Sequence, residues 1–511
     1  MEQYDIIIIG TGAGGGTLLH ALKDCGKKIL VLERGTFLPR EKENWDSVAV
    51  FQQDRYHTSE VWKTSEEKDF HPQTGYWVGG NTKVYGAALF RLREKNFESV
   101  THFDGVTPEW PLKYADFEPF YTEAEKLYDV HGRMGDDPTE PFRSGEYPYP
   151  PLAHEPRIQE LHDALQARGL HPFCLPIGVK RNEKDPLNSP CIRCDTCDGF
   201  PCLLHAKADA DINCVRPSLQ QAQVTLMTEM QATRLLTNAS GTSIKAVEAS
   251  RNGEKFVFSA DLVVLAAGAV NSAILLLRSA TDLHPGGLAN GSGLVGRNLM
   301  KHHNAAMLAI STKPNPTRFQ KTLAVNDFYW GDADFNFPMG HIQLMGKSNK
   351  DQISPDAPFF TPGLVLEEMA GHSVDWWFTA EDLPSPENRV TLQGGQIHIQ
   401  YTESNTRGLE RLQDTWSHIL RESDDASHFI PHSIYLKKDI PLQGLAHQCG
   451  TCRFGTDAAS SVLNTDCRTH QLDNLYVVDG SFFPSSGAVN PSLTIMANAL
   501  RVGKRLVELF K

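Results

Sequence analysis

The chain has 511 residues, which is too long for a single hydrophobic core, so we expect two domains. Acidic residues outnumber basic ones, 62 Asp and Glu against 49 Lys and Arg, and no basic stripe appears, which argues against nucleic acid as a partner. No apolar run reaches the roughly 18 residues of a membrane span, and the chain starts with a predicted strand rather than a signal peptide. We therefore expect a cytoplasmic protein with no membrane partner, whose ten cysteines are mainly reduced.

The first predicted element is a strand that runs into a glycine turn. Four consecutive isoleucines, residues 6–9, are typical of a buried parallel strand. Gly10, Gly12 and Gly15 follow in the spacing G-x-G-x-x-G, which allows a tight turn, a close approach to a pyrophosphate and close packing of the next helix. A helix over residues 17–25 would offer its N-terminus to the phosphate.

A second predicted strand, residues 28–32, ends at Glu33, the position at which such folds place an acid that binds ribose hydroxyls. Strand, turn, helix, strand and acid in this order predict a Rossmann-like domain, and a glycine-rich loop without a ligand is the alternative. The cofactor-binding residues predicted in this unit are Gly10, Gly12, Ala13, Gly14, Gly15 and Glu33.

A second glycine-containing stretch lies at residues 76–88. Paired glycines followed by small residues suit a backbone that lies against a flat ligand, such as the ring or pyrophosphate of a flavin, and an ordinary turn is the alternative. Here the chain resembles the glucose-methanol-choline (GMC) oxidoreductase family, whose flavin loop is similar to residues 79–86. The resemblance implies FAD contacts from Gly79, Gly80, Asn81 and Thr82.

The same loop bears on how the flavin is attached. Val84 stands where the related pyranose oxidases carry the histidine that bonds covalently to the flavin, so the resemblance implies non-covalent FAD. Tyr85 stands where several members of the family have asparagine. Residues 110–121 are also similar to the family, at its pyranose-oxidase and gluconate-dehydrogenase end.

Four cysteines lie close together in the sequence, at Cys191, Cys194, Cys197 and Cys202. Thiolates at this spacing can hold zinc or an iron–sulfur cluster, and some flavin dehydrogenases of the family carry a cluster in a similarly placed segment. The ferredoxin pattern is not reproduced, because four residues separate the last two cysteines and no proline follows the fourth. Free thiols or a local disulfide are therefore favoured, and no metal site is predicted.

Two further predicted strands, residues 224–227 and 261–265, return to the first domain. The second runs into small residues and then into a helix over 272–278, as the last strand of a dinucleotide-binding domain does beside its cofactor. The family has a similar run of small residues at this point, and the resemblance implies FAD contacts from Ala267 and Gly268.

From residue 302 to about 442 helical periodicity fades, and alternating patterns predict an antiparallel sheet that would roof the flavin and supply the substrate pocket. Aromatic and polar residues at 327–337 and 376–378 suit a sugar face, although aromatic residues in a sheet more often form core. The predicted fold class is α/β, with a Rossmann-like FAD-binding domain of GMC type interleaved with an antiparallel-sheet substrate-binding domain. The expected boundaries are 1–95, 186–301 and 443–511 for the first domain, and 96–185 and 302–442 for the second.

The C-terminal part carries the predicted chemistry. Residues 447–455 and 487–494 are similar to two turns that, in the family, place a His/His or His/Asn pair over the flavin, and here the pair is His447 and Asn490. Histidine has a pKa suited to accept the hydroxyl proton while a hydride moves from the alcohol carbon to flavin N5. Asparagine cannot act as a base, but its amide can donate to the developing alkoxide. We therefore expect His447 to be the base and Asn490 to position the oxygen.

Between these turns, a short predicted strand ends in an Asp-Gly step that in the family lies by the ribityl chain and pyrophosphate. The helix that follows would point its N-terminus at the flavin, where its dipole favours negative charge on the reduced ring. The contacts implied here come from Asp479, Gly480, Asn490, Pro491 and Ser492.

The resemblance covers nearly the whole chain, with motifs near residues 10, 80, 205, 268, 296, 384, 447 and 490 in family order. It implies FAD-dependent oxidation of a secondary alcohol to a ketone, and the features similar to pyranose oxidases and glycoside 3-oxidases favour C2 or C3 of a sugar or glycoside. The acceptor would be oxygen or a quinone-like compound. Three alternatives remain: a GMC dehydrogenase for a non-sugar alcohol or polyol, with or without an iron–sulfur cluster; a nicotinamide-dependent dehydrogenase; and a non-catalytic flavin-binding protein.

Overall fold

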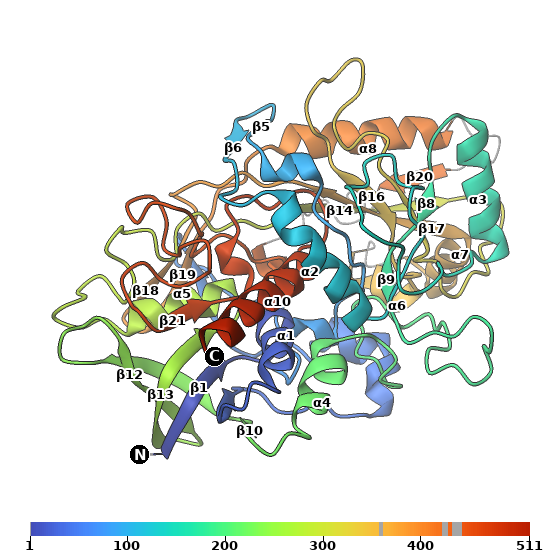
Figure 1. Ribbon diagram of the computed structural model, residues 1–511. Coiled ribbons are helices and arrows are strands. Elements are labelled where there is room, and N and C mark those ends of the chain that lie inside the picture. Colours follow the sequence, from blue (N-terminus) through green and yellow to red (C-terminus); the bar gives the residue numbers. More distant parts are fainter. Residues whose placement is uncertain (1, 357–360, 422–427, 432–441, 511) are drawn as a thin grey trace.

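The structure is a computed structural model that describes residues 2–356, 361–421, 428–431 and 442–510. Two large sheets lie in different parts of the molecule, one at the lower left of Figure 1 and one at the right. The predicted domain boundary at residue 442 borders residues 432–441, which lie outside the described ranges. The position of that boundary stays a prediction.

The first sheet contains the N-terminal strand at its centre, with the four isoleucines buried. Its parallel strands run in the order β10, β2, β1, β13, and β21 continues beside the carboxyl end of β13. Strands β12 and β11 extend the sheet antiparallel. The bounds are β1 Glu2–Ile9, β2 Ile29–Leu32, β10 Val224–Met227, β11 Gln231–Thr237, β12 Ile244–Arg251, β13 Glu254–Leu265 and β21 Leu475–Val477. Because the carboxyl ends of parallel strands share one edge, the segments after β1, β2, β13 and β21 meet there.

Helices α1 and α10 lie side by side against this sheet (Figure 1). They approach closely because Gly503 of α10 faces Ala21 of α1, where a Cβ on the glycine would lie 2.6 Å from the Ala21 Cβ. Helix α2 packs on α10, and the hydroxyls of Tyr121 and Thr494 are 2.8 Å apart. The helices are α1 Ala13–Leu22, α2 Tyr114–Leu127, α3 Pro156–Ala167, α4 Arg216–Ser218, α5 Ala269–Arg278, α6 Lys350–Ile353, α7 Gly363–His372, α8 Thr406–Arg421 and α10 Ser492–Leu509.

The first helix begins four residues earlier than the sequence predicts, at Ala13 instead of residue 17. Glycines normally disfavour a helix, but here Gly15 lies where a Cβ would be 2.0 Å from the Gly10 carbonyl oxygen. The close packing of helix on strand therefore requires the glycine that made the segment look like a loop.

The second sheet is antiparallel throughout, as predicted, in the order β20, β14, β17, β16, β15, β8. The expectation of an all-strand middle is wrong, because α7 and α8 also belong to it. Helix α8 packs on the sheet through Trp416, whose ring centroid is 4.8 Å from that of Trp376. The strands are β8 Phe173–Cys174, β14 His303–Ile310, β15 Leu323–Val325, β16 His341–Leu344, β17 Ser373–Ala380 and β20 His428–Pro431.

Two strands predicted for this sheet pair elsewhere. Strands β18 (Arg389–Gln393) and β19 (Gln396–Gln400) form a four-stranded sheet with β3 (Trp62–Thr64) and β4 (Asp69–Phe70). The parallel contact between β19 and β3 joins segments more than 300 residues apart, which no local pattern indicates. The short pairs are β5 (Val100–Thr101) with β6 (Val106–Thr107), and β7 (Val130–His131) with β9 (Ile177–Gly178).

Across the ranges that the structure describes, no helix combines the length and the apolar composition that crossing a bilayer requires.

Candidate active site

A cavity of about 530 Å³ lies where the ends of the parallel strands meet the second sheet. It is lined by the segments that follow β1, β2, β13 and β21, and by side chains of β16 and β17. Most of the residues predicted from the sequence line it: Gly10, Gly12, Ala13, Gly14, Glu33, Gly80, Asn81, Thr82, Ala267, Gly268, His447, Asp479, Gly480, Asn490, Pro491 and Ser492. Gly15 and Gly79 are not part of the lining.

These two glycines shape the backbone beside the cavity. Gly15 packs against the turn that holds Gly10, as described above. Gly79 has a φ of +99°, a conformation that favours glycine, and its N–H donates to the Thr11 hydroxyl at 3.0 Å. The Thr82 hydroxyl donates to the Gly79 carbonyl at 2.6 Å, which closes the loop on itself.

The glycine turn after β1 packs directly against the backbone of two neighbouring strand ends. Gly10 has a φ of +99°, and a Cβ there would lie 2.4 Å from the Ala266 carbonyl oxygen. A Cβ on Gly14 would lie 2.4 Å from the Val478 carbonyl oxygen. Helix α1 has no capping side chain at its start, so the N–H groups of its first turn remain available to an anion.

Glu33 closes the edge of the cavity beside β2. One carboxylate oxygen accepts from the Thr11 hydroxyl at 2.5 Å and from the Thr11 N–H at 3.1 Å, and the other accepts from the Gly35 N–H at 2.9 Å. Burial raises the pKa of Glu33, while these hydrogen bonds lower it. The carboxylate is thus held in place at the cavity wall, as binding of a ribose hydroxyl would require.

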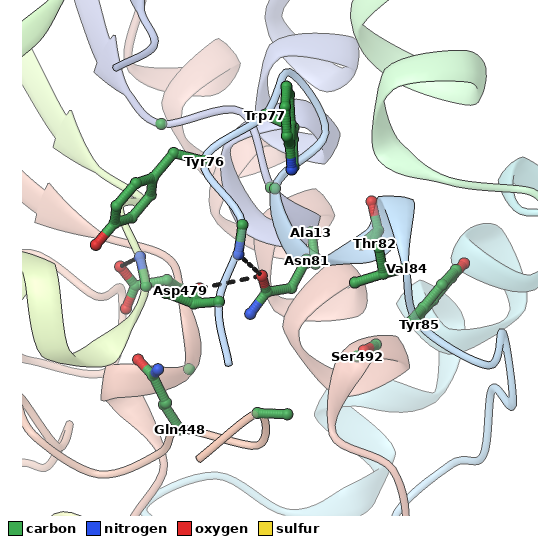
Figure 2. A pocket seen from close by; sticks show the side chains of 18 of the residues that line it. Ala13, Tyr76, Trp77, Asn81, Thr82, Val84, Tyr85, Gln448, Asp479 and Ser492 are labelled. Atoms are coloured by element: carbon green, nitrogen blue, oxygen red, sulfur yellow. Dashed lines mark hydrogen bonds between the residues drawn. The ribbon is translucent and has the colours of Figure 1, made fainter. Parts of the chain in front are cut away.

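Asn81 anchors the second glycine loop. Its Oδ1 accepts from the Thr74 hydroxyl and from the Gly75 N–H, both at 3.0 Å, and Figure 2 shows these bonds beside the open space of the cavity. Val84 and Tyr85 both line the cavity, and the hydroxyl of Tyr85 donates to the Ala208 carbonyl. Tyr85 therefore ties the loop to the segment before α4.

Asp479, labelled in Figure 2, follows β21 and hydrogen-bonds to the segment between β13 and α5 and to α5 itself. Its Oδ2 accepts from the Gly268 N–H at 3.0 Å and from the Ser272 hydroxyl at 2.5 Å, and its Oδ1 accepts from the N–H and hydroxyl of Ser481. Burial raises the pKa of Asp479. The carboxylate fixes the backbone on which Gly268 and Gly480 face the cavity.

His447 contacts a second histidine that the sequence analysis missed. The Nδ1 atoms of His447 and His302 are 3.0 Å apart, and the rings meet edge to face. His302 Nε2 lies 3.3 Å from the Ser486 carbonyl, so it carries a hydrogen and donates. His302 Nδ1 then accepts from His447 Nδ1–H, and the lone pair of His447 lies on Nε2.

Both histidines are neutral near physiological pH. Burial, the neighbouring His302 and the charge of Lys321 lower the pKa of His447 to about 3. Burial also lowers the pKa of His302 to about 4. No described residue hydrogen-bonds to Nε2 of His447, so a neutral imidazole nitrogen is available in the cavity.

Asn490 lies in the same cavity, just before α10. Its Oδ1 is buried and finds no hydrogen-bond partner among the described residues. A buried amide is normally paired, so this one has a bond left for a ligand. Helix α10 also begins without a capping side chain, which leaves the N–H groups of its first turn available.

Two more buried residues hold the Asn490 turn. The Gly487 N–H donates to Glu381 at 2.7 Å, and the Ala488 N–H donates to the Tyr329 hydroxyl at 3.0 Å. Sequence reasoning missed both roles and that of His302. His302 lies six residues after position 296, near which a family motif was recognised, and this was the available signal.

The four clustered cysteines are free thiols, as are the other six. Within the described ranges no group of three His, Cys, Asp or Glu side chains is placed to hold a metal ion. Burial raises the pKa of Cys191 to about 11, so its thiol is protonated. Lys207, fully buried, donates to the carbonyls of Cys197 and Phe200 at 2.7 Å and holds this segment against the cavity.

The cavity fits the cofactor that the sequence predicts. Two uncapped helix starts suit a pyrophosphate and a flavin ring, and the Glu33 carboxylate suits a ribose. The unpaired Oδ1 of Asn490 leaves one polar atom for a bound ligand. The residues present thus suit a dinucleotide in the same cavity that His447 and Asn490 line.

Comparison with known proteins gives matches along the whole chain. Two GMC oxidoreductase family models match residues 4–304 and 384–499. The chain is 31% identical to 6'''-hydroxyparomomycin C oxidase of Streptomyces lividus, over 99% of this chain and 91% of that one. It is 28% identical to paromamine 6'-oxidase of Streptomyces fradiae, over 98% and 91%. The crystal structure of pyridoxine 4-oxidase from Mesorbium loti has the same fold, with a TM-score of 0.68, 19% identity and 98% coverage of both chains.

Proposed function

The chain belongs to the GMC oxidoreductase family, and on that basis we propose that it oxidises a hydroxyl group of a sugar or glycoside. As a member of this family, the protein is an FAD-dependent enzyme that acts on alcohols. The observation that carries the site assignment is the pair of His447 and Asn490 in one cavity, each with an unpaired polar atom.

His447 acts as the general base in this proposal. Its Nε2 lone pair accepts the hydroxyl proton of the substrate, while its Nδ1–H stays bonded to His302. The Asn490 amide binds the same oxygen and positions it. When bound, FAD supplies the acceptor for the hydride that leaves the alcohol carbon.

FAD would be held without a covalent bond. The first turn of α1 would bind its pyrophosphate, Glu33 a ribose hydroxyl, and the first turn of α10 the flavin ring. Val84 lines the cavity at the loop position where the related pyranose oxidases carry histidine, and its side chain has no nucleophilic atom.

Similarity to two oxidases with sugar-like substrates supports a sugar or glycoside as the substrate class. The resemblance to pyranose oxidases and glycoside 3-oxidases favours a secondary ring hydroxyl at C2 or C3. The names of both relatives instead carry position 6, which in a hexopyranose is the primary exocyclic hydroxymethyl group. A primary alcohol is therefore the second candidate, and since both relatives are oxidases, oxygen is the favoured acceptor over a quinone-like compound.

An anaerobic absorption spectrum tests the substrate class. We expect the flavin bands of purified enzyme to bleach with at least one pyranose or glycoside and to return when air is admitted. Cyclohexanol and propan-2-ol serve as simple alcohol controls. If only the simple alcohols bleach the flavin, the sugar proposal is rejected. Product analysis then separates the positions, because a ring hydroxyl gives a ketone and the hydroxymethyl group gives an aldehyde.

The pH profile tests the role of His447. A lowered pKa means that the neutral base persists at acidic pH, so the rate of flavin reduction should change by less than about twofold between pH 8 and 5. Stopped-flow measurements at saturating substrate give this rate, with circular dichroism at each pH to check folding. A fall in rate centred near pH 6.5 would show that the base titrates like an exposed histidine.

A further inference from the structure

An ion pair that the mechanism does not use lies on the wall of the cavity. Lys321 Nζ is 2.8 Å from Asp198 Oδ2, and both residues line the cavity together with Gly86. Asp198 comes from the cysteine-rich segment, and Lys321 comes from the chain just before β15. The pair therefore joins two segments that are 123 residues apart in the sequence.

The pair is only partly satisfied by the protein. Asp198 Oδ2 accepts from Lys321 and from the Gly346 N–H at 3.1 Å, but Oδ1 accepts no hydrogen bond from any residue within the described ranges. The Lys321 ammonium has three donors, and Asp198 is its one hydrogen-bond partner in the described part of the chain. The Lys321 side chain is 7% exposed and that of Asp198 is 21% exposed. Asp198 Oδ1 is not among the fully buried unpaired atoms of the described residues, so it can be reached from the cavity and can still accept from a ligand.

The pair lines the same cavity as His447, beside the second glycine loop. A Cβ on Gly86 would be 2.0 Å from both Asp198 Oδ1 and Lys321 Nζ, so the pair sits directly on the loop that ends the flavin-binding stretch. The charge of Lys321 is close enough to His447 to lower the pKa of that histidine. Gln343 of β16 and Trp377 of β17 line the same cavity.

The ionisation state of Asp198 follows from its surroundings. Burial raises the pKa of Asp198, but the charge and hydrogen bond of Lys321, the Gly346 N–H and the charge of Lys207 together bring it below the usual value. A carboxylate and an ammonium thus stand side by side with no net charge, which suits a neutral polar ligand better than an ionic one.

We propose that Asp198 and Lys321 bind neighbouring hydroxyl groups of the substrate, away from the hydroxyl that is oxidised. Asp198 Oδ1 accepts from one hydroxyl, and Lys321 Nζ donates to the oxygen of the next. This inference rests on the proposed function and narrows its substrate class to alcohols that carry a vicinal diol beside the reacting position.

The test compares Asp198→Asn and Lys321→Met enzymes on the best pyranose, on its monodeoxy analogues and on cyclohexanol. Each variant should raise KM for the pyranose about 10- to 100-fold with kcat changed less than about threefold, because a hydrogen bond to a charged group is lost. The rate of cyclohexanol oxidation should change less than about threefold, because cyclohexanol has no second hydroxyl group. Lys313→Met is the matched control, because Lys313 forms an ion pair with Glu160 at 2.6 Å and is about half exposed outside the cavity.

The deoxy analogues separate binding from structure. In the parent enzyme, removal of the bound hydroxyl from the sugar should raise KM about as much as the Asp198→Asn or Lys321→Met substitution does. In the variant, the same deoxy sugar should have nearly the same KM as the complete sugar. If the variants lost the same fraction of their activity on the pyranose and on cyclohexanol, the pair would have a structural role and the inference would be overturned. An unchanged KM in both variants, while the parent enzyme oxidises the pyranose, would overturn this inference alone. If no pyranose is oxidised by the parent enzyme, the proposed function falls and this inference falls with it.

Discussion

Replacement of His447 by glutamine is expected to slow substrate-dependent flavin reduction by roughly 10²- to 10⁴-fold, the usual contribution of a general base. Glutamine keeps a polar group near His302 but has no nitrogen lone pair that can take a proton at neutral pH. Flavin content and the wavelength of its absorption bands should stay unchanged, since other residues of the cavity hold the cofactor. Anaerobic stopped-flow reduction at saturating substrate gives the rate.

A second histidine provides the control for this variant. His171 has a side chain that is 64% exposed and pairs with Asp327, so His171→Gln should reduce at the parental rate. If His447→Gln enzyme retained the parental rate with bound flavin, another residue would have to be the base. A loss of flavin in His447→Gln, by contrast, would show that the histidine holds the cofactor.

The second large effect is expected at Gly10. In Gly10→Ala the new Cβ would lie 2.4 Å from the Ala266 carbonyl oxygen, in a backbone conformation at φ +99° that strains any side chain. We expect a loss of most bound FAD and a clear fall in the unfolding midpoint, because the strand-to-helix turn must open to relieve the contact. Flavin absorbance per protein and thermal unfolding measure the two effects.

Gly26 makes the matched comparison, since it lies in the same strand–helix–strand unit. It has a φ of +76°, but a Cβ there would meet nothing within 4 Å. Gly26→Ala should therefore show the backbone strain alone, about 1–2 kcal/mol, with normal FAD content. Equal behaviour of the two variants would mean that the close approach at Gly10 is not what shapes the site.

The dinucleotide-binding half could be predicted because its signals are local. Four isoleucines, a fixed glycine spacing and an acid at the end of the next strand all fall within about 30 residues, as such units do. The same holds for the Asp479 strand end and for the start of α10. Even here the helix start was misplaced, because Gly15 looks like a loop residue until the strand it packs on is known.

For the middle of the chain, the sequence-based prediction was wrong in a different way. Helix α8 was missed although Leu409, Leu412, Trp416 and Leu420 recur at helical spacing. Strands β18 and β19 were recognised by their alternation but assigned to the wrong sheet. Alternation of apolar and polar residues indicates that a segment is a strand with one buried face, but it does not indicate which sheet the strand joins.

The sequence by itself determined the fold class, the dinucleotide turn and the two side chains, His447 and Asn490, that face the cavity. Tertiary structure alone decided which distant residues they and their neighbours meet. His302, 145 residues before His447, hydrogen-bonds to it and orients its ring. Lys321, 123 residues after Asp198, forms the ion pair on the cavity wall. The physical reason is the separation along the chain over which each kind of interaction acts. Turn geometry and periodicity act between neighbours along the chain, whereas burial, pKa and hydrogen bonding depend on which distant segments the folded sheets bring together.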